Sequence, residues 1–264
     1  MEKTWRLIDS GPCRASYNMA LDEAIATYVR KGESPPTLRL YAWDMPSLSL
    51  GCFQKVSGID AGYCSEKKIP IVRRPTGGRA ILHDDELTYS FSVGTDNDLF
   101  SKGILDSYRK ISVAFSLAFG KIGIYAESKK QRERGGVLTK SPLCFQSSSF
   151  GEILIDNKKA VGSAQKRWND GLLQQGSIPY LYNAEVMCNI FRTAKTSSLR
   201  DCMVGLKEVL PGLKEDEFRK QISASFEETF EVRLVPDRPS QEEVLLAKEF
   251  EDRKYLQGSW NFRQ

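Results

Sequence analysis

Long apolar runs are missing from this sequence. No hydrophobic stretch among its 264 residues approaches the roughly 20 residues that a membrane-spanning helix requires. The first ten residues, MEKTWRLIDS, carry charged side chains and then a short strand-like stretch, a pattern typical of neither a signal peptide nor a transit peptide. We therefore expect a cytoplasmic protein that does not act in a membrane.

Cysteine and histidine are also scarce. The six cysteines lie at positions 13, 52, 64, 144, 188 and 202, with no CxxC pair and no zinc-like spacing, and there is a single histidine. In a reducing compartment such cysteines are free thiols rather than disulfides, and most of them fill the core. The composition therefore predicts no metal site and at most one reactive cysteine.

The charge balance is close to neutral. There are 38 Lys and Arg residues against 34 Asp and Glu residues, which gives a formal net charge of +4. This excess is too small to predict nucleic-acid binding, but it fits a protein that meets acidic partners. Neither an internal repeat nor a low-complexity linker divides the chain. We expect one domain over residues 1–264, with a helical C-terminal part from about residue 184.

The hydrophobic pattern predicts strands first and helices later, with some helices in between. Alternating or continuous apolar runs predict strands at 37–41, 47–51, 69–72, 87–93, 151–155, 159–165 and 172–181. The residues Asp156-Asn157-Lys158 predict a hairpin turn between 151–155 and 159–165. Apolar residues at helical spacing predict helices at 17–30, 104–119 and 218–230, and a capping box at Ser240 and Glu243 begins a last helix through Phe250. The fold class is therefore α/β (α+β), with a mixed, largely antiparallel sheet flanked by helices. Since no βαβ alternation is visible, a Rossmann fold is not expected.

The most unusual segment is RRPTGGRAILH, residues 73–83. Its glycine pair allows backbone dihedral angles closed to other residues and leaves room for a ligand to take hydrogen bonds from main-chain N–H groups. The arginines supply planar donors suited to phosphate or carboxylate groups. The candidate binding residues are Arg73, Arg74, Gly77, Gly78, Arg79 and His83. The alternative is a plain surface turn with solvated arginines; a P-loop is excluded because no GK[ST] follows.

His83 is the only histidine, and it lies just beyond the glycine pair. A single histidine at a strand end is usually a hydrogen-bonded structural group. Its place near the turn favours a role in the site. The acidic residues 84–86 that follow could orient it or could form a solvated turn.

A second focus is Cys144, where a polar loop meets a strand-forming segment. Lys159 opens the strand that follows, and the small residues Gly162, Ser163 and Ala164 end it, which indicates close approach of a ligand. An ammonium near Cys144 that lowers a thiol pKa from about 8.5 to about 7 raises the thiolate fraction at neutral pH to about half. The alternatives are an inert buried thiol and a solvated hairpin lysine.

Four motifs together resemble one family. RRPTGGRAILHDDELTYSF resembles the signature segment of the lipoate–protein ligases and octanoyltransferases, which share a catalytic fold with biotin–protein ligases. NMALDEA near the start, KKAVGSAQ in the middle and Lys254-Tyr255 with Trp260-Asn261 at the end fit the same family. The resemblance covers nearly the whole chain and implies a biotin/lipoate protein ligase-like fold.

Within that family, a cysteine in a CF-x-SS context before K-x-x-GSAQ is similar to the cysteine-dependent octanoyltransferases. The resemblance implies that Cys144 takes an octanoyl group from acyl carrier protein as a thioester and passes it to a lysine of a lipoyl-domain protein. Such acceptors are the glycine cleavage H protein and dehydrogenase E2 subunits. Lys159 would activate the cysteine, and the residues of the glycine turn would line the acyl pocket. No cofactor is implied.

Two departures separate the chain from the ATP-using ligases of the same family. Arg79 stands where those ligases tend to have a third glycine, and HDDELTY replaces a segment resembling HD-x-GN-x-N. Both differences favour acyl transfer without adenylation. The alternatives are an ATP-dependent lipoate–protein ligase, an octanoyl amidotransferase between lipoyl domains, and a non-catalytic relative that binds lipoyl domains. The basic residues Lys129, Lys130, Arg132 and Arg134 could steer acidic carrier proteins or form a solvated loop.

Overall fold

The alternating segment around residues 87–93 becomes a central strand of a mixed sheet. The computed structural model describes residues 3–95, 99–128, 152–192 and 196–263. The strands of the large sheet are β1 (Lys3–Cys13), β2 (Thr37–Trp43), β6 (Glu86–Gly94), β7 (Glu127–Ser128), β8 (Ile153–Ile155), β9 (Lys158–Arg167), β10 (Gly171–Pro179) and β11 (Val232–Pro236). Within the described ranges they pair in the order β11-β1-β2-β6-β10-β9-β8-β7. β11, β1 and β2 are parallel and the other neighbours antiparallel, which confirms the predicted mixed, largely antiparallel sheet.

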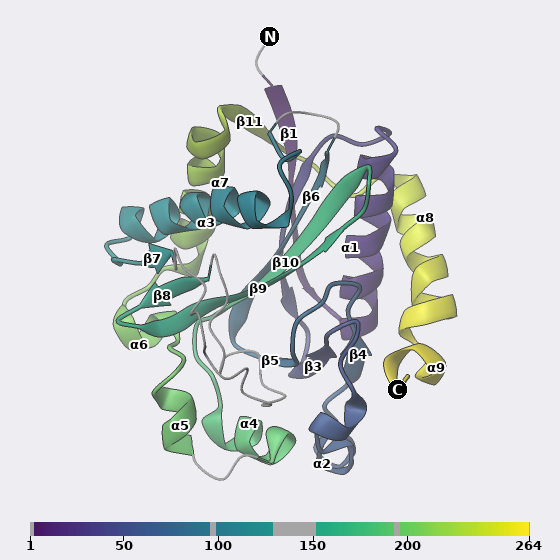
Figure 1. Cartoon of the computed structure of the whole chain (residues 1–264), viewed down its shortest axis with the longest axis vertical. Coiled ribbons are helices and arrows are strands. Elements are labelled where there is room, and N and C mark those ends of the chain that lie inside the picture. The colour runs from purple at the N-terminus through teal and green to yellow at the C-terminus, as the bar shows by residue number, and fades with distance from the viewer. Residues whose placement is uncertain (1–2, 96–98, 129–151, 193–195, 264) are drawn as a thin grey trace.

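The two faces of the large sheet differ because side chains alternate along each strand. On one face, Tyr89 and Phe91 join an apolar core with α3 (Ile104–Lys121) and α7 (Glu215–Phe230). On the other face, Thr88 and Ser90 are buried, and Ser90 reaches the first helix, α1 (Ala15–Arg30). Figure 1 shows α3 and α7 on one side of the sheet, and α1 with α8 (Gln241–Phe250) on the other. The polar face of β6 is therefore interior rather than solvated.

A small second sheet brings the charged turn to the α1 side of the molecule. It consists of β3 (Ser47–Leu50), β4 (Ile71–Arg73) and β5 (Ile81–His83) in the order β4-β3-β5. β3 is parallel to β4 and antiparallel to β5. The turn 74–80 joins β4 to β5, so it projects from the end of this sheet (Figure 1).

Shorter helices complete the described chain. They are α2 (Ala61–Glu66), α4 (Ala184–Phe191), α5 (Thr196–Arg200), α6 (Leu206–Val209) and α9 (Gly258–Asn261), with a 3-10 turn η1 (Val56–Gly58) and a π-helical segment η3 (Glu251–Tyr255). Of the helices in these ranges, none is both long and apolar enough to cross a bilayer.

Two local predictions are confirmed and one regional prediction is incomplete. The β8–β9 hairpin turns at Asp156 and Asn157, which both have positive φ (49° and 61°), as a type I′ turn requires. Ser240 and Glu243 form the predicted capping box of α8. The C-terminal part is not wholly helical, however, because β11 lies within it and pairs with β1. A parallel partner more than two hundred residues away leaves no local signal.

Candidate active site

A cleft opens between α1, the small sheet and the polar face of the large sheet. Its walls are formed by Met19, Tyr41, Trp43, Ser49, Arg74, Ile81, His83, Thr88, Gly162, Ala164, Gln175, Gly176 and Ser177. The cavity volume between these walls is about 20 Å³, so an acyl chain can enter only if the walls separate. Several elements distant in sequence therefore meet around one small cleft. It is the place where the predicted turn and the predicted GSA strand come together.

A larger cavity, with a volume of about 680 Å³, lies near α4 to α6 and is open to solvent. Its walls include the charged residues Asp84, Asp85, Arg200 and Glu208, and none of the predicted site residues. Because bound acyl chains need apolar walls, we place the candidate site in the smaller cleft.

The glycine turn is shaped by close backbone approach. Gly78 has a φ of +83°, a conformation that favours glycine. A Cβ atom at Gly51 would lie 1.9 Å from the Gly78 carbonyl oxygen, and one at Gly78 would lie 3.5 Å from Cβ of Ala164. The turn therefore touches both β3 and β9. Neither Gly77 nor Gly78 is among the residues that line the cleft. Within the described part of the chain, their N–H groups make no hydrogen bond to another protein group, so both remain available to a ligand beside the cleft.

Arg74 braces this turn from inside the cleft. Its guanidinium donates to the carbonyl oxygen of Ser49 at 3.1 Å and to those of Gly77 and Arg79 at 2.7 Å each. The side chain is buried and lines the cleft. Arg79 is half-buried and does not line the cleft, although its carbonyl oxygen takes part in the brace. Arg74 therefore gives the turn its shape.

Arg73 points away from the cleft. It is fully buried, and its guanidinium donates to main-chain oxygens of Gly51 (2.8 Å), Gln54 (2.6 Å) and Arg263 (3.0 Å). Its own N–H donates to the Asn261 side chain at 2.9 Å. Burial lowers the pKa of the Arg73 guanidinium, and the positive charge of Arg263 lowers it further. The structure thus uses Arg73 to hold the C-terminal segment rather than to line the acyl pocket as predicted.

His83 is held on both ring nitrogens. Nδ1 lies 2.7 Å from Oε1 of Glu86, and Nε2 lies 2.7 Å from Oγ of Ser49. The ring stacks on Trp43 with centroids 4.0 Å apart and an interplanar angle of 13°. Glu86 also accepts from Ser177 at 2.6 Å. Of the acidic residues 84–86, Glu86 is therefore the one that orients the histidine.

Lys159 is buried rather than solvated. Its side chain is 2% exposed, and Nζ lies 2.5 Å from Oε1 of Glu152, which is also buried. Its backbone N–H donates to the Cys202 carbonyl oxygen at 2.9 Å, beside a β-bulge in the β8–β9 pairing. The sequence analysis did not predict Glu152 as the partner of Lys159, although Glu152 directly precedes β8, the strand that pairs with the Lys159 strand β9. Lys159 does not line the cleft described above.

Cys144 lies outside the described residues, as do the four basic residues of the 129–134 segment. The other cysteines are free thiols, namely Cys13, Cys52, Cys64, Cys188 and Cys202. Burial raises the pKa of Cys13 and Cys202, and raises that of Cys64 to about 11. These three thiols are therefore protonated near neutral pH. Cys52 is buried with its sulfur 2.9 Å from Nη2 of Arg263.

The small residues of β9 divide between the two faces of the sheet. Gly162 and Ala164 line the cleft, whereas the Ser163 hydroxyl lies 2.9 Å from the hydroxyl of Tyr89 on the opposite face. Met19, Trp43 and Gln175 complete the walls, and sequence reasoning missed them. The alternation of side chains along β9 could have predicted that Ser163 faces away from Gly162 and Ala164. Met19, Trp43 and Gln175 could not be predicted, because they come from separate elements that only the fold brings together.

Comparison with known proteins agrees with this geometry. A family model described as the lipoyl protein ligase A/B catalytic domain matches residues 14–227. A curated relative from Clostridioides difficile (strain 630), named octanoyltransferase LipM, is 37% identical over 97% of this chain and 98% of its own length. A second curated relative with the same name, from Geobacillus kaustophilus (strain HTA426), is 33% identical over 100% of this chain and 99% of its own length. A solved structure of lipoate-protein ligase A bound with ATP has a TM-score of 0.83 at 24% identity, covering 99% of each chain, and so shares the fold.

Proposed function

Because the chain belongs to the lipoyl protein ligase A/B catalytic domain family, we propose that it is an octanoyltransferase of protein lipoylation. It moves an octanoyl group from acyl carrier protein to a lysine of a lipoyl-domain protein, such as the glycine cleavage H protein or a dehydrogenase E2 subunit. The observation that carries the proposal is the cleft lined by Arg74 of the turn and by Ala164 of the KKAVGSAQ strand, where Gly78 of the turn lies close to Ala164. The full-length similarity to proteins named octanoyltransferase LipM supports this choice over other activities of the family.

The first half-reaction transfers the acyl group to the enzyme. The thiolate of Cys144 attacks the thioester carbonyl of octanoyl–acyl carrier protein, and a new carbon–sulfur bond forms as the old one breaks. The carrier thiolate leaves and takes up the proton that Cys144 has lost. One thioester replaces another, so the step needs no ATP and no metal.

The second half-reaction makes the amide. The neutral ε-amine of the lipoyl-domain lysine attacks the thioester on Cys144, and the bond between the carbonyl carbon and the cysteine sulfur breaks. The attacking nitrogen loses a proton, which the Cys144 sulfur takes up as it leaves, so the thiol of Cys144 is restored. Conversion of a thioester to an amide is downhill, so this step drives the cycle.

Lys159 supplies positive charge for the thiolate and for the oxygen that gains charge during attack. Its ion pair with Glu152 supports this role by holding the ammonium in one place inside the protein. The same carboxylate partly offsets the charge of the lysine, and a buried pair is only weakly screened by solvent. We expect Lys159 and Glu152 to act as one unit on the Cys144 thiolate.

The cleft holds the acyl chain and its carbonyl. Apolar parts of Met19, Tyr41 and Trp43 suit an unbranched hydrocarbon chain. We expect the N–H groups of Gly77 and Gly78, which make no hydrogen bond within the described residues, to donate to the carbonyl oxygen as it becomes more negative during bond formation.

The proposal is tested by the intact mass of the protein after mixing with octanoyl–acyl carrier protein, with and without ATP. A single octanoyl adduct that hydroxylamine removes and that needs no ATP is expected. Formation of an acyl-adenylate from lipoate and ATP without a carrier would instead identify an ATP-dependent ligase. An adduct from an octanoylated lipoyl domain, but not from acyl carrier protein, would identify an amidotransferase. No adduct from either donor would identify a non-catalytic lipoyl-domain-binding protein.

A further inference from the structure

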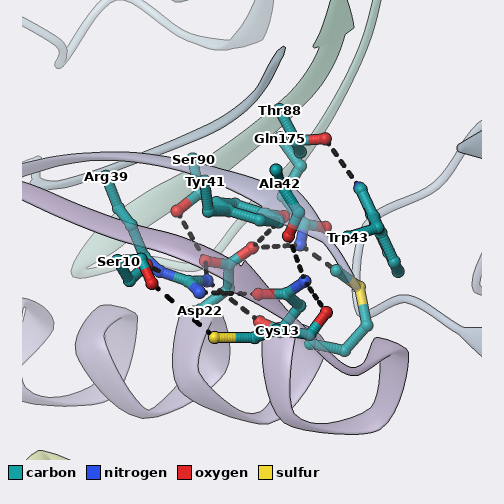
Figure 2. A network of polar contacts seen from close by, with 12 residues as sticks. Ser10, Cys13, Asp22, Arg39, Tyr41, Ala42, Trp43, Thr88, Ser90 and Gln175 are labelled. Carbon is teal, nitrogen blue, oxygen red and sulfur yellow. Dashed lines mark hydrogen bonds and ion pairs between the residues drawn. The ribbon is translucent and has the colours of Figure 1, made fainter. Parts of the chain in front are cut away.

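Of the NMALDEA motif, only Met19 enters the acyl transfer just described, as part of the cleft wall, yet one carboxylate of the motif organises that wall. Asp22 of α1 is fully buried. Its carboxylate accepts hydrogen bonds from side chains of β2, β6 and β10, namely Arg39 (2.7 Å), Tyr41 (2.9 Å), Ser90 (2.6 Å) and Gln175 (2.7 Å). Figure 2 shows Asp22 extending from the helix into this group of strand side chains. A buried charge of this kind must be paired, and Arg39 pairs it.

The ion pair determines how the amide of Gln175 is turned. Because an ionised carboxylate only accepts hydrogen bonds, the NH₂ group of Gln175 must face Asp22. The amide oxygen then points the other way, and it accepts a hydrogen bond from the hydroxyl of Thr76 at 2.8 Å. Gln175 therefore has one orientation, with its NH₂ group toward the helix and its oxygen toward the glycine turn.

Thr76 is the point at which the glycine turn is attached to the large sheet. It is fully buried and directly precedes Gly77 and Gly78. Its carbonyl oxygen accepts from the N–H group of Cys52 at 2.8 Å, so its two oxygens join the turn to the 51–54 loop and to β10. A displacement of Thr76 would carry the glycine N–H groups with it.

We propose that Gln175 is a positioning residue for acyl transfer: oriented by Asp22, it holds Thr76 and so fixes the position of the glycine turn that carries the N–H groups of Gly77 and Gly78. This inference rests on the proposed function, in which those groups receive the acyl carbonyl. In this proposal, Asp22 of NMALDEA orients the Gln175 amide so that its oxygen faces Thr76.

The neighbouring Gln174 provides a matched control. It is similarly buried, at 1% exposed against 5% for Gln175, and lies on the same strand. Its side chain faces the opposite side of the sheet, where it donates to the Tyr89 hydroxyl at 2.8 Å and accepts from Gln165 at 3.0 Å. Loss of either amide should reduce stability by a comparable amount, but only loss of Gln175 should move the turn.

The test compares Gln175→Leu with Gln174→Leu, and Thr76→Val with Thr76→Ser. The rate of thioester formation from octanoyl–acyl carrier protein should fall at least about tenfold in Gln175→Leu and Thr76→Val, since small displacements of positioned groups have large effects on rate. Gln174→Leu should stay within about threefold of wild type, and Thr76→Ser should retain most activity because it keeps the hydroxyl.

A second measurement does not depend on activity. Hydrogen exchange of the Cys52 N–H group, followed by NMR, reports whether the turn stays attached. Exchange should be faster in Gln175→Leu and Thr76→Val than in the two controls. If the Cys52 exchange rate is the same in Gln175→Leu and Gln174→Leu, the positioning role is wrong. Absence of a wild-type adduct would instead refute the proposed function while leaving this structural comparison valid.

Discussion

The ammonium of Lys159 and the carboxylate of Glu152 lie 2.5 Å apart, and both side chains are buried at the start of the β8–β9 hairpin. A charge buried without its partner is costly, so neither residue can be removed without affecting the other. Any experiment on the lysine must therefore separate its effect on chemistry from its effect on stability.

Single substitutions in this pair should be strongly destabilising. Lys159→Met and Glu152→Gln should each reduce the free energy of unfolding by roughly 3–5 kcal/mol, because each removes one member of a buried ion pair. The double variant should lose less than the sum of the two. Urea denaturation followed by circular dichroism measures all four proteins. Strict additivity would show that the two side chains do not interact in solution.

The proposed nucleophile can be identified by exchange of single cysteines. Cys144→Ser should lose the hydroxylamine-labile octanoyl adduct and the transfer to lipoyl domain. Cys52→Ser should keep both, since the Cys52 sulfur is buried beside Arg263 and outside the cleft walls. Intact mass spectrometry gives the result directly. An adduct that survives in Cys144→Ser but disappears in Cys52→Ser would reverse the assignment.

The two glycines of the turn should respond differently to a methyl group. Gly78→Ala places a side chain at a φ of +83° with its Cβ 2.9 Å from Nη2 of Arg74, so a loss of about 1–2 kcal/mol in stability is expected together with slower acyl transfer. At Gly77 nothing lies within 4 Å of an added Cβ. Gly77→Ala should therefore be much milder in stability. Equal losses in thermal denaturation would contradict this reading of the turn.

The cleft should set the length of the acyl chain. Ala164→Leu adds bulk to a narrow cleft, so transfer from an octanoyl donor should fall by more than about tenfold, while a butyryl donor should be less affected. Ser163→Ala is the control, because Ser163 faces the other side of the sheet toward Tyr89. Steady-state rates with both donors make the comparison. The same fractional loss for both chain lengths would place the acyl chain elsewhere.

Stability should decrease at alkaline pH through Tyr255. Burial, and then the negative charge of Glu23 beside it, raises the pKa of the Tyr255 phenol well above its usual value of 10.0. Its hydroxyl donates to Glu23 at 2.6 Å. Because the pKa of this phenol is higher in the folded than in the unfolded state, its contribution to stability is fully present below about pH 10. Above that pH the phenol of the unfolded state ionises first, and the contribution is lost. In Tyr255→Phe, the free energy of unfolding from urea denaturation should therefore fall less steeply between about pH 9 and about pH 11 than in wild type. If it falls just as steeply, other groups cause the alkaline loss of stability.

Much of the fold could be predicted because its signals are local. The alternation of β6, the helical spacing of α3 and α7, the β8–β9 turn and the capping box of α8 each depend on residues within a few positions of one another. β11 was missed because its partner β1 lies at the other end of the chain. Pairing over that distance is decided by packing of the whole sheet.

The candidate site shows the same division. Residue types and spacing were enough to single out the glycine turn and the GSA strand, which do meet at the cleft. The sequence could not predict that Arg74 lines the cleft while Arg73 binds the C-terminal segment, because the two residues are the same type and adjacent in the chain. Opposite directions of neighbouring side chains follow from where the strand lies in the fold.

By itself, the sequence determined the family, the order of most elements and the set of residues able to do acyl-transfer chemistry, because these depend on composition and on spacing along the chain. Only the tertiary structure decided the partners: Glu152 for Lys159, Glu86 for His83, and Asp22 with Gln175 for Thr76. Hydrogen bonds and ion pairs act over about 3 Å, and which groups come that close is set by strand register and helix packing.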